Sequence, residues 1–313
     1  MGERLIGKGV VVTGSGQGIG RAVAVAMAQE GARVVTNNRQ AGTEGGDAET
    51  TAQEIRALGG EAVATFADVG DYESAGRLIR TCVDNFGRID ILVNCAANVG
   101  PGVIYEMTEK EWDDLIRVHL KGTFNTCRHA TPLMKAQGSG RIINTASVAW
   151  YYITVGSAAY SAAKGGIVSL TREIAREMGA FGLTCNAIAP DAATRIGPGS
   201  PMTDYGLREW YKAGMMSEAE LKFCLNVPGP EFVAPLYVYL ATDEASHING
   251  RVFRDGGGSI SLYPEPVEVR TIHKDPKRQG PWTLDELVEI VPRSLTVGLG
   301  PIPPYPPREK APF

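Results

Sequence analysis

The chain has 313 residues, of which 43% are hydrophobic and 21% are charged, and its formal net charge at pH 7 is −4. These values are typical of a globular α/β protein with one large domain or two small ones. No dense run of Lys and Arg predicts a nucleic-acid surface, and no apolar run is long enough to span a membrane. The five cysteines and four histidines show no paired or metal-ligand spacing. We therefore expect a cytoplasmic protein with free thiols, no metal ion, no nucleic-acid partner and no membrane partner.

A short β-branched stretch, residues 9–13, leads into a glycine-rich loop (Gly14-Ser-Gly-Gln-Gly-Ile-Gly20) and then into an Ala-rich apolar segment. This order predicts a strand, a tight turn and a helix. Glycines let a phosphate approach the backbone, and the helix N-terminus offers free N–H groups to a pyrophosphate. The alternative is a plain turn, because a glycine loop alone is a weak signal. We predict that the loop binds a dinucleotide through Gly14, Gly16, Gln17, Gly18, Ile19 and Gly20.

Residues 32–37 predict a second strand, and the end of this strand is where a nucleotide-binding fold recognises the adenosine ribose. The chain has Asn38 and Arg39 there, and no acid until Glu44. An Arg suits the 2′-phosphate of NADP, whereas an acid would accept from the 2′-hydroxyl of NAD. We therefore expect NADP in preference to NAD, with Asn38 and Arg39 in the cofactor site. The alternative is an ordinary solvated arginine. Residues 40–48 predict a flexible insert.

Strand and helix patterns then alternate along the chain. Further strands are predicted over residues 62–66, 89–93, 141–145, 183–188 and 251–253, and helices over 49–58, 72–86, 108–134, 160–178 and 232–240. This alternation predicts a Rossmann-like α/β fold with a doubly wound, parallel, seven-stranded sheet in a single domain, residues 1–262. Ligands of such sheets bind beyond the carboxyl ends of the strands. The further cofactor residues expected there are Asp68, Val69, Asn94, Ala96 and Pro190.

A candidate catalytic group follows the fifth predicted strand. Ser147 lies just beyond the strand, and Tyr160 and Lys164 are four residues apart, which places them on one face of a helix. An ammonium beside a phenol stabilises the phenolate and lowers its pKa from the ordinary value of ~10, which suits proton transfer near neutral pH. By itself this spacing is also a common accident on helix surfaces. Its position among the other strand ends favours a site.

Taken together, these pieces resemble the short-chain dehydrogenase/reductase family over residues 1 to about 260. The matching motifs are TGSGQGIG (13–20), DV (68–69), NCAA (94–97), YSAAK (160–164) and NAIAP (186–190), with Ser147 placed 13 residues before Tyr160. The resemblance implies that Tyr160 is the general acid or base and that Ser147 hydrogen-bonds the substrate oxygen. It also implies that Lys164 lowers the pKa of Tyr160 and holds the nicotinamide ribose. Within the family, the chain is most similar to the (3R)-hydroxyacyl-CoA dehydrogenase unit of multifunctional enzyme type 2.

Several positions depart from the common family pattern. His119 stands where most members have an Asn that holds a water of a proton relay. An imidazole can pass a proton, so His119 is a candidate catalytic residue, and a buried structural histidine is the alternative. Asp191 replaces the usual Gly after the sixth strand, and Arg195 takes the place of a Thr that contacts the nicotinamide carboxamide. Asn38 replaces the Asp that the subgroup likeness predicts, which again favours NADP.

Residues 195–230 form the segment that usually covers the substrate in this family, and here it is rich in Met and aromatic side chains. We expect Trp210 in this lid, with Trp150 and Tyr152 just after Ser147, to line the pocket for a bulky or apolar substrate. The alternative is that these residues only pack the lid.

Residues 263–313 form a Pro-rich extension, since 11 of the 19 prolines lie in residues 264–313. We expect a short helix over residues 282–291, capped by Thr283 with Glu286, that docks on the body or on a neighbouring subunit. Disorder from about Gly300 is the alternative.

The function expected from the sequence is an NAD(P)-dependent oxidoreductase that interconverts a secondary alcohol and a ketone. The alternative within enzymes is a (3R)-hydroxyacyl-CoA dehydrogenase that uses NAD. An alternative of another class is a catalytically silent nucleotide-binding scaffold, against which the intact Ser147, Tyr160 and Lys164 argue. The family resemblance implies a homotetramer or a homodimer.

Overall fold

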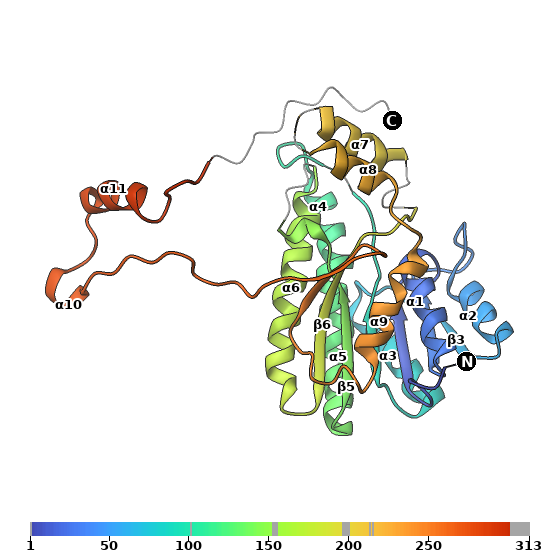
Figure 1. The fold of residues 1–313 in the computed structure, drawn as a ribbon. Coiled ribbons are helices and arrows are strands. Elements are labelled where there is room, and N and C mark those ends of the chain that lie inside the picture. Colours follow the sequence, from blue (N-terminus) through green and yellow to red (C-terminus); the bar gives the residue numbers. More distant parts are fainter. Residues whose placement is uncertain are drawn as a thin grey trace. The chain divides into compact units, whose positions relative to one another are not determined.

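The computed structural model describes residues 2–100, 102–151, 156–195, 201–212, 214 and 216–300. Its central sheet lies between layers of helices (Figure 1). The sheet has eight strands in the order β3-β2-β1-β4-β5-β6-β7-β8. The parallel strands are β1 (Gly9–Thr13), β2 (Arg33–Asn38), β3 (Glu61–Phe66), β4 (Ile91–Asn94), β5 (Gly140–Thr145), β6 (Leu183–Pro190) and β7 (Val252–Asp255). The predicted parallel, doubly wound sheet is confirmed. The structure adds one short strand at the edge, β8 (Ile260–Leu262), which pairs antiparallel with β7.

Helices cover both faces of the sheet. The face toward which Val10 and Val12 of β1 point packs against α1 (Gly18–Gln29), α2 (Ala48–Ala57) and α9 (Ala234–Ala241). The opposite face, toward which Val11 points, packs against α3 (Tyr72–Phe86), α5 (Gly122–Gln137) and α6 (Ala158–Gly179). Because the parallel strands are buried on both faces, they appear in the sequence as continuous apolar runs such as GVVVT, which is buried throughout.

The long helix predicted over residues 108–134 is interrupted in the structure. It begins as α4 (Glu109–Ile116), with Thr108 and Glu111 forming the predicted capping box. It then passes through a π-helical turn, η1 (Arg117–Lys121), into α5. Such turns are rare in helices and are frequently found at functional sites. The sequence pattern did not reveal this one, since the apolar periodicity continues through it.

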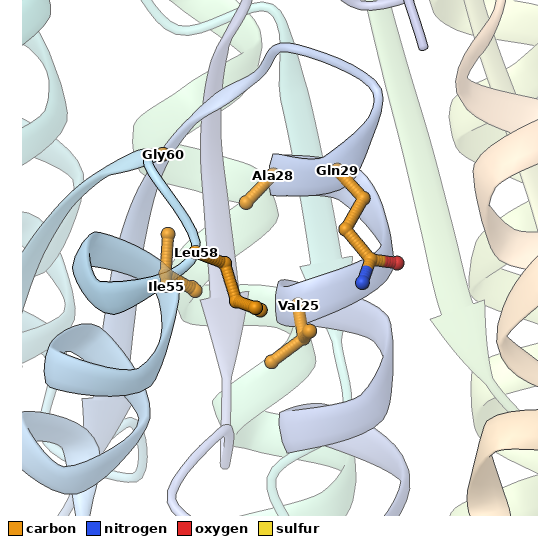
Figure 2. A pocket seen from close by; sticks show the side chains of 6 residues that line it. All are labelled: Val25, Ala28, Gln29, Ile55, Leu58 and Gly60. Atoms are coloured by element: carbon orange, nitrogen blue, oxygen red, sulfur yellow. The ribbon is translucent and has the colours of Figure 1, made fainter. Parts of the chain in front are cut away.

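A small apolar pocket lies between α1 and the end of α2 (Figure 2). Gln29 is the last residue of α1, and Gly60 directly precedes β3, so the pocket lies at the amino ends of the strands. Ligands of parallel sheets bind at the other end. We therefore assign no cofactor or substrate to this pocket.

The carboxyl edge of the sheet carries the elements that matter for the site. Among them are the 3₁₀ turn η2 (Val148–Trp150) after β5, the helices α7 (Pro201–Lys212) and α8 (Glu218–Leu225) of the segment predicted as a lid, and the 3₁₀ turn η3 (Pro230–Phe232) before α9. No helix in the described part of the chain is both long and apolar enough to cross a membrane.

The chain divides into two compact units, and the second begins at Pro264. It contains α10 (Pro276–Gln279) and α11 (Leu284–Arg293). The predicted cap of α11 is confirmed, because Thr283 and Glu286 form a capping box. The Lys274 ammonium lies 2.5 Å from a carboxylate oxygen of Glu286 and braces the start of this helix. No residue of the unit up to residue 300 is buried. Residues 301–313 lie outside the described residues.

Candidate active site

Three predicted catalytic side chains come together at the carboxyl end of β5. Ser147 directly precedes η2, and its hydroxyl accepts the N–H of Ala149 at 3.3 Å and hydrogen-bonds the phenol of Tyr160. Tyr160 lies in the first turn of α6. Lys164, one turn further along α6, places its ammonium 5.5 Å from the centre of the Tyr160 ring. The same ammonium donates to the backbone carbonyl of Thr145 at 2.6 Å.

The pKa of the Tyr160 phenol does not follow the expectation from the sequence. Burial raises it above its ordinary value, the hydrogen bond from Ser147 lowers it, and the nearby carboxylate of Asp191 raises it further. The lowered pKa expected from the sequence was therefore wrong for this structure, because burial dominates the pKa of the phenol and the Lys164 ammonium donates to the Thr145 carbonyl. Burial lowers the pKa of Lys164 itself to about 8. At neutral pH the phenol keeps its proton, which suits a general acid.

His119 lies beside this group, on the π-helical turn η1. Its ring is 1% exposed and meets the Tyr160 ring edge-on, with centroids 5.2 Å apart. Its Nε2 is 3.0 Å from the carbonyl oxygen of Asn98, and its buried Nδ1 has no hydrogen-bond partner among the described residues. Burial and the charge of Lys164 lower its pKa to about 3, so the imidazole is neutral at physiological pH.

The glycine loop between β1 and α1 fits a pyrophosphate. Gly14 has φ +64°, a conformation that favours glycine, and a Cβ on Gly20 would lie 2.4 Å from the carbonyl oxygen of Gly14. Gln17, the N-cap residue of α1, makes no side-chain cap hydrogen bond. The first N–H groups of the helix are therefore left for an anion, as dinucleotide binding requires.

The side chain of Gln17 joins three segments that are far apart in the sequence. Its Nε2 donates to the carbonyls of Glu44 at 2.5 Å and Gly46 at 2.9 Å, both in the insert after β2. Its Oε1 accepts from Nε of Arg195 at 3.1 Å. Gln17 was predicted only as a loop residue that contacts the cofactor. In the structure it also connects the cofactor loop to the insert and to the first residue of the predicted lid segment.

The two residues predicted to recognise the adenosine ribose differ in their surroundings. The amide of Asn38 donates to the carbonyl of Gln40 at 2.8 Å and to the hydroxyl of Thr43 at 3.0 Å, and it accepts from the N–H of Ala48 at 2.8 Å. This side chain therefore closes the insert and holds the start of α2. Arg39, the next residue, is exposed.

Asp68 follows β3, as predicted. One carboxylate oxygen accepts from Arg117 and the other from the N–H of Gly70, both at 2.8 Å. Partial burial alone would raise its pKa, but Arg117, Gly70 and the charge of Arg39 together hold the pKa below its ordinary value. The charge of Arg39 therefore acts on a second residue predicted for the cofactor site.

The other predicted cofactor residues lie at or just after the carboxyl ends of strands, and some of them make hydrogen bonds to other residues of the protein. Asn94 is 6% exposed; its amide donates to Asn144 at 2.9 Å and accepts from Thr126 at 2.7 Å. Ala96 donates its N–H to the hydroxyl of Thr13 at 3.0 Å, which fixes the chain next to the glycine loop. The remaining residues of this set are Gly16, Gly18, Ile19, Val69 and Pro190, of which Gly18 and Ile19 begin α1 and Pro190 ends β6.

Sequence reasoning missed one charged pair near the site. Nε of Arg254 on β7 donates to the carboxylate of Asp191, just after β6, at 2.8 Å, and the guanidinium lies over the ring of Phe223. Neighbouring strands bring the pair together, because Pro190 is in register with Asp255. Asp191 was flagged only as a departure from the family pattern, and no local signal marked Arg254.

The predicted substrate residues are only partly described. Trp150 on η2 and Trp210 on α7 are both half-buried, and Tyr152 lies outside the described residues. Trp150 contacts two further aromatic rings, those of Tyr151 and Tyr263.

Within the described ranges, no group of three or more His, Cys, Asp or Glu side chains is arranged to hold a metal ion.

Comparison with known proteins identifies the family and supports the fold. The short chain dehydrogenase family model matches residues 8–195. A 3-oxoacyl-[acyl-carrier-protein] reductase from Staphylococcus aureus is 37% identical over 252 residues, which is 80% of this chain and 97% of that protein. Peroxisomal multifunctional enzyme type 2 from Mus musculus is 38% identical over 262 residues, which is 82% of this chain and 32% of that protein. The crystal structure of a short chain dehydrogenase from Mycobacterium avium is 38% identical, with a TM-score of 0.79 over 96% of this chain and 99% of that chain. The chain therefore belongs to the short-chain dehydrogenase family of oxidoreductase enzymes, as its motifs predicted.

Proposed function

We propose that this enzyme interconverts a secondary alcohol and a ketone with NAD(P)(H), using Tyr160 as the general acid or base. The observation that carries the proposal is the hydrogen bond between Ser147 and Tyr160, with the Lys164 ammonium 5.5 Å from the phenol ring. This group and the glycine loop are at the same edge of the sheet. The nicotinamide supplies the hydride when it is bound.

The roles of the chain's own residues follow from this geometry. In ketone reduction, the Ser147 hydroxyl holds the carbonyl oxygen, where negative charge develops. Tyr160 donates its proton to that oxygen, since burial keeps the phenol protonated at neutral pH. Lys164 supplies positive charge beside the phenol, and we assign it the nicotinamide ribose hydroxyls as ligands. His119 is neutral, and its unpartnered Nδ1 makes it a candidate to pass the proton onward.

The substrate class has two candidates. Trp150, three residues after Ser147, and the aromatic content of the predicted lid segment, which includes Trp210 on α7, favour a bulky or apolar ketone. The second candidate is an acyl thioester. The name of the Staphylococcus aureus relative favours a 3-oxoacyl thioester, and the motif resemblance favours a (3R)-hydroxyacyl-CoA with NAD as cofactor. Both candidates present the same group, a secondary alcohol or ketone, to Tyr160.

Turnover of a carbonyl panel tests the function. Purified protein should oxidise NADPH or NADH in the presence of at least one member of a panel of acetoacetyl-CoA, longer 3-oxoacyl-CoA thioesters, cyclic ketones and steroid ketones. Absence of turnover with every member and both nucleotides, while nucleotide binding persists, would favour the scaffold alternative. The preferred member distinguishes the two substrate classes.

For the cofactor, we propose NADP in preference to NAD, because Arg39 is exposed just after β2 and its charge acts on Asp68, another predicted cofactor residue. Arg39→Ala should weaken NADPH binding by about tenfold, the cost of one charge-assisted contact to a phosphate, and should leave NADH binding unchanged. Titration of reduced-nicotinamide fluorescence measures both affinities. Arg77→Ala, which removes an exposed arginine on α3, is the matched control and should leave both affinities unchanged. An unchanged NADPH affinity in Arg39→Ala would show that this arginine does not recognise the phosphate.

We further infer that the enzyme is a homodimer or homotetramer in which residues 263–313 dock on the body or on a neighbouring subunit. Leu284 and Val288 on α11 are 76% and 67% exposed, so this helix has an apolar face that its own unit does not cover. A helix this short is marginal alone and needs packing to persist. Light scattering of the full chain would measure the oligomeric state.

A cytoplasmic location suits the five cysteines, which are all free thiols.

A further inference from the structure

Three aromatic rings from two distant parts of the chain contact one another near the candidate active site. Tyr263 follows the edge strand β8, and its ring centre is 5.4 Å from that of Trp150 and 5.1 Å from that of Tyr151. The rings of Trp150 and Tyr151 are 5.3 Å apart. The three pairs are edge-on or tilted, the arrangements that aromatic pairs prefer. Tyr263 is fixed in turn by its backbone, because its N–H donates to the carbonyl of Val252 on β7 at 2.9 Å.

Trp150 closes the turn that begins at Ser147. Its N–H donates to the carbonyl of Ser147 at 3.1 Å, and the N–H of Ala149 donates to the Ser147 hydroxyl at 3.3 Å. The next residue, Tyr151, donates its N–H to the carbonyl of Val148 at 3.2 Å. The Ser147 hydroxyl that hydrogen-bonds Tyr160 is therefore part of a short turn whose far end carries the two rings that contact Tyr263.

The turn is held on two sides. On one side, β5 leads directly into it and is paired along its length with β6. On the other, Trp150 and Tyr263 pack on the same apolar cluster, which is formed by Ala146, Val168, Ala187, Ala189 and Val252. Without the Tyr263 ring, Trp150 would lose its edge-on partner from the far end of the sheet. The turn would then be anchored by β5 and the cluster alone.

We propose that Tyr263 is a positioning residue for Ser147. Its ring holds Trp150 and Tyr151, and through them it fixes the turn that places the Ser147 hydroxyl against Tyr160. The proposal rests on the function proposed above and adds to it a residue outside the family motifs. It also assigns a role to the antiparallel strand β8. This strand reverses the chain along β7 and so places Tyr263 opposite Val252.

Hydrogen exchange tests the structural half of the proposal without any need for turnover. In the full chain, Tyr263→Ala should speed amide exchange in a peptide that covers residues 147–151 by about tenfold or more, and Tyr263→Phe should leave it within about twofold of the wild type. Tyr239→Ala, a 44% exposed tyrosine on α9, is the matched control and should change nothing in that peptide. Unchanged exchange in Tyr263→Ala would overturn the proposal.

A double-mutant cycle tests the functional half, with the best carbonyl of the panel as substrate. Tyr263→Ala should lower kcat/KM by about tenfold through misplacement of one hydroxyl, with the pH profile and cofactor affinity unchanged. In a Ser147→Ala background, Tyr263→Ala should cost less than about twofold, because the group it positions is already gone. A full additional tenfold loss in that background would contradict the proposal. If Ser147→Ala alone retains full activity while Tyr263→Ala still speeds exchange, the proposed role of Ser147 fails and the positioning of the turn stands.

Discussion

Tyr160→Phe should lower kcat for ketone reduction by about 10²–10⁴-fold, the contribution typical of one positioned general acid. The substitution removes the hydroxyl that hydrogen-bonds Ser147 and keeps the ring that packs edge-on against His119 at 5.2 Å. The fold and cofactor affinity should therefore be unchanged. Steady-state rates with the best carbonyl of the panel measure the loss, and nucleotide fluorescence measures the affinity.

The outcome is specific to this phenol. Tyr239→Phe, on the exposed side of α9, should leave the rate unchanged. Ser147→Ala should also lower kcat, by the 10²–10³-fold typical of one lost hydrogen-bond donor to a developing oxyanion. The combined variant should be little worse than Tyr160→Phe, because the two groups act on the same oxygen. A Tyr160→Phe enzyme that keeps more than a tenth of wild-type activity would remove the phenol from the mechanism.

The sheet could be predicted from the sequence because each strand is marked by a pattern of neighbouring residues. Each parallel strand is buried on both faces, so it appears as a short apolar run, and each run is followed by a helical pattern. The antiparallel strand β8 gives no such signal, since its three residues are exposed and Ile260 and Leu262 lie at the sheet edge. Within the site, Tyr160 and Lys164 could be located because one helical turn joins them.

The contacts around that site depend on chain segments that only folding brings together. Arg254 meets Asp191 because β7 lies beside β6, and Gln17 meets Arg195 across most of the domain's sequence. Tyr263 reaches Trp150 because a short antiparallel strand reverses the chain. The pKa of Tyr160 was predicted in the wrong direction for the same reason. The sequence predicts an ammonium nearby, but burial, which is the largest influence on this pKa, is a property of the whole fold.

The electrostatic state of the site follows from three pKa values. The pKa of His119 is lowered to about 3 and that of Tyr160 is raised, so both side chains are neutral at physiological pH. Lys164, with a pKa lowered to about 8, carries the positive charge beside them and loses it as the pH rises through 8. Lys164 therefore supplies a positive charge beside the phenol below that pH, which suits stabilisation of charge on the substrate oxygen.

Lys164→Met should lower kcat by about 10²-fold or more and at the same time raise the free energy of unfolding at pH 7. Burial lowers the pKa of this lysine from 10.5 to about 8, so the folded state disfavours the charged form by about 3 kcal/mol relative to the unfolded state. Met keeps the apolar stem, removes the charge, and leaves the Thr145 carbonyl without its donor, which costs about 1 kcal/mol. The net gain should be about 2 kcal/mol at pH 7, measured by urea unfolding.

The pH dependence of this gain identifies its cause. Between pH 8 and 10.5, wild-type Lys164 is neutral in the folded state and still charged in the unfolded state, so wild-type stability from this group rises with pH. The advantage of Lys164→Met should therefore shrink through that window and disappear above it, when the lysine is neutral in both states. Lys121→Met, an exposed lysine on η1, should show neither the gain nor its pH dependence. A Lys164→Met enzyme that is less stable at pH 7, by an amount that does not change up to pH 10, would mean that the wild-type ammonium is well solvated in the folded state. An inactive and more stable variant would show that the buried Lys164 ammonium lowers the free energy of unfolding and is kept because the reaction requires it.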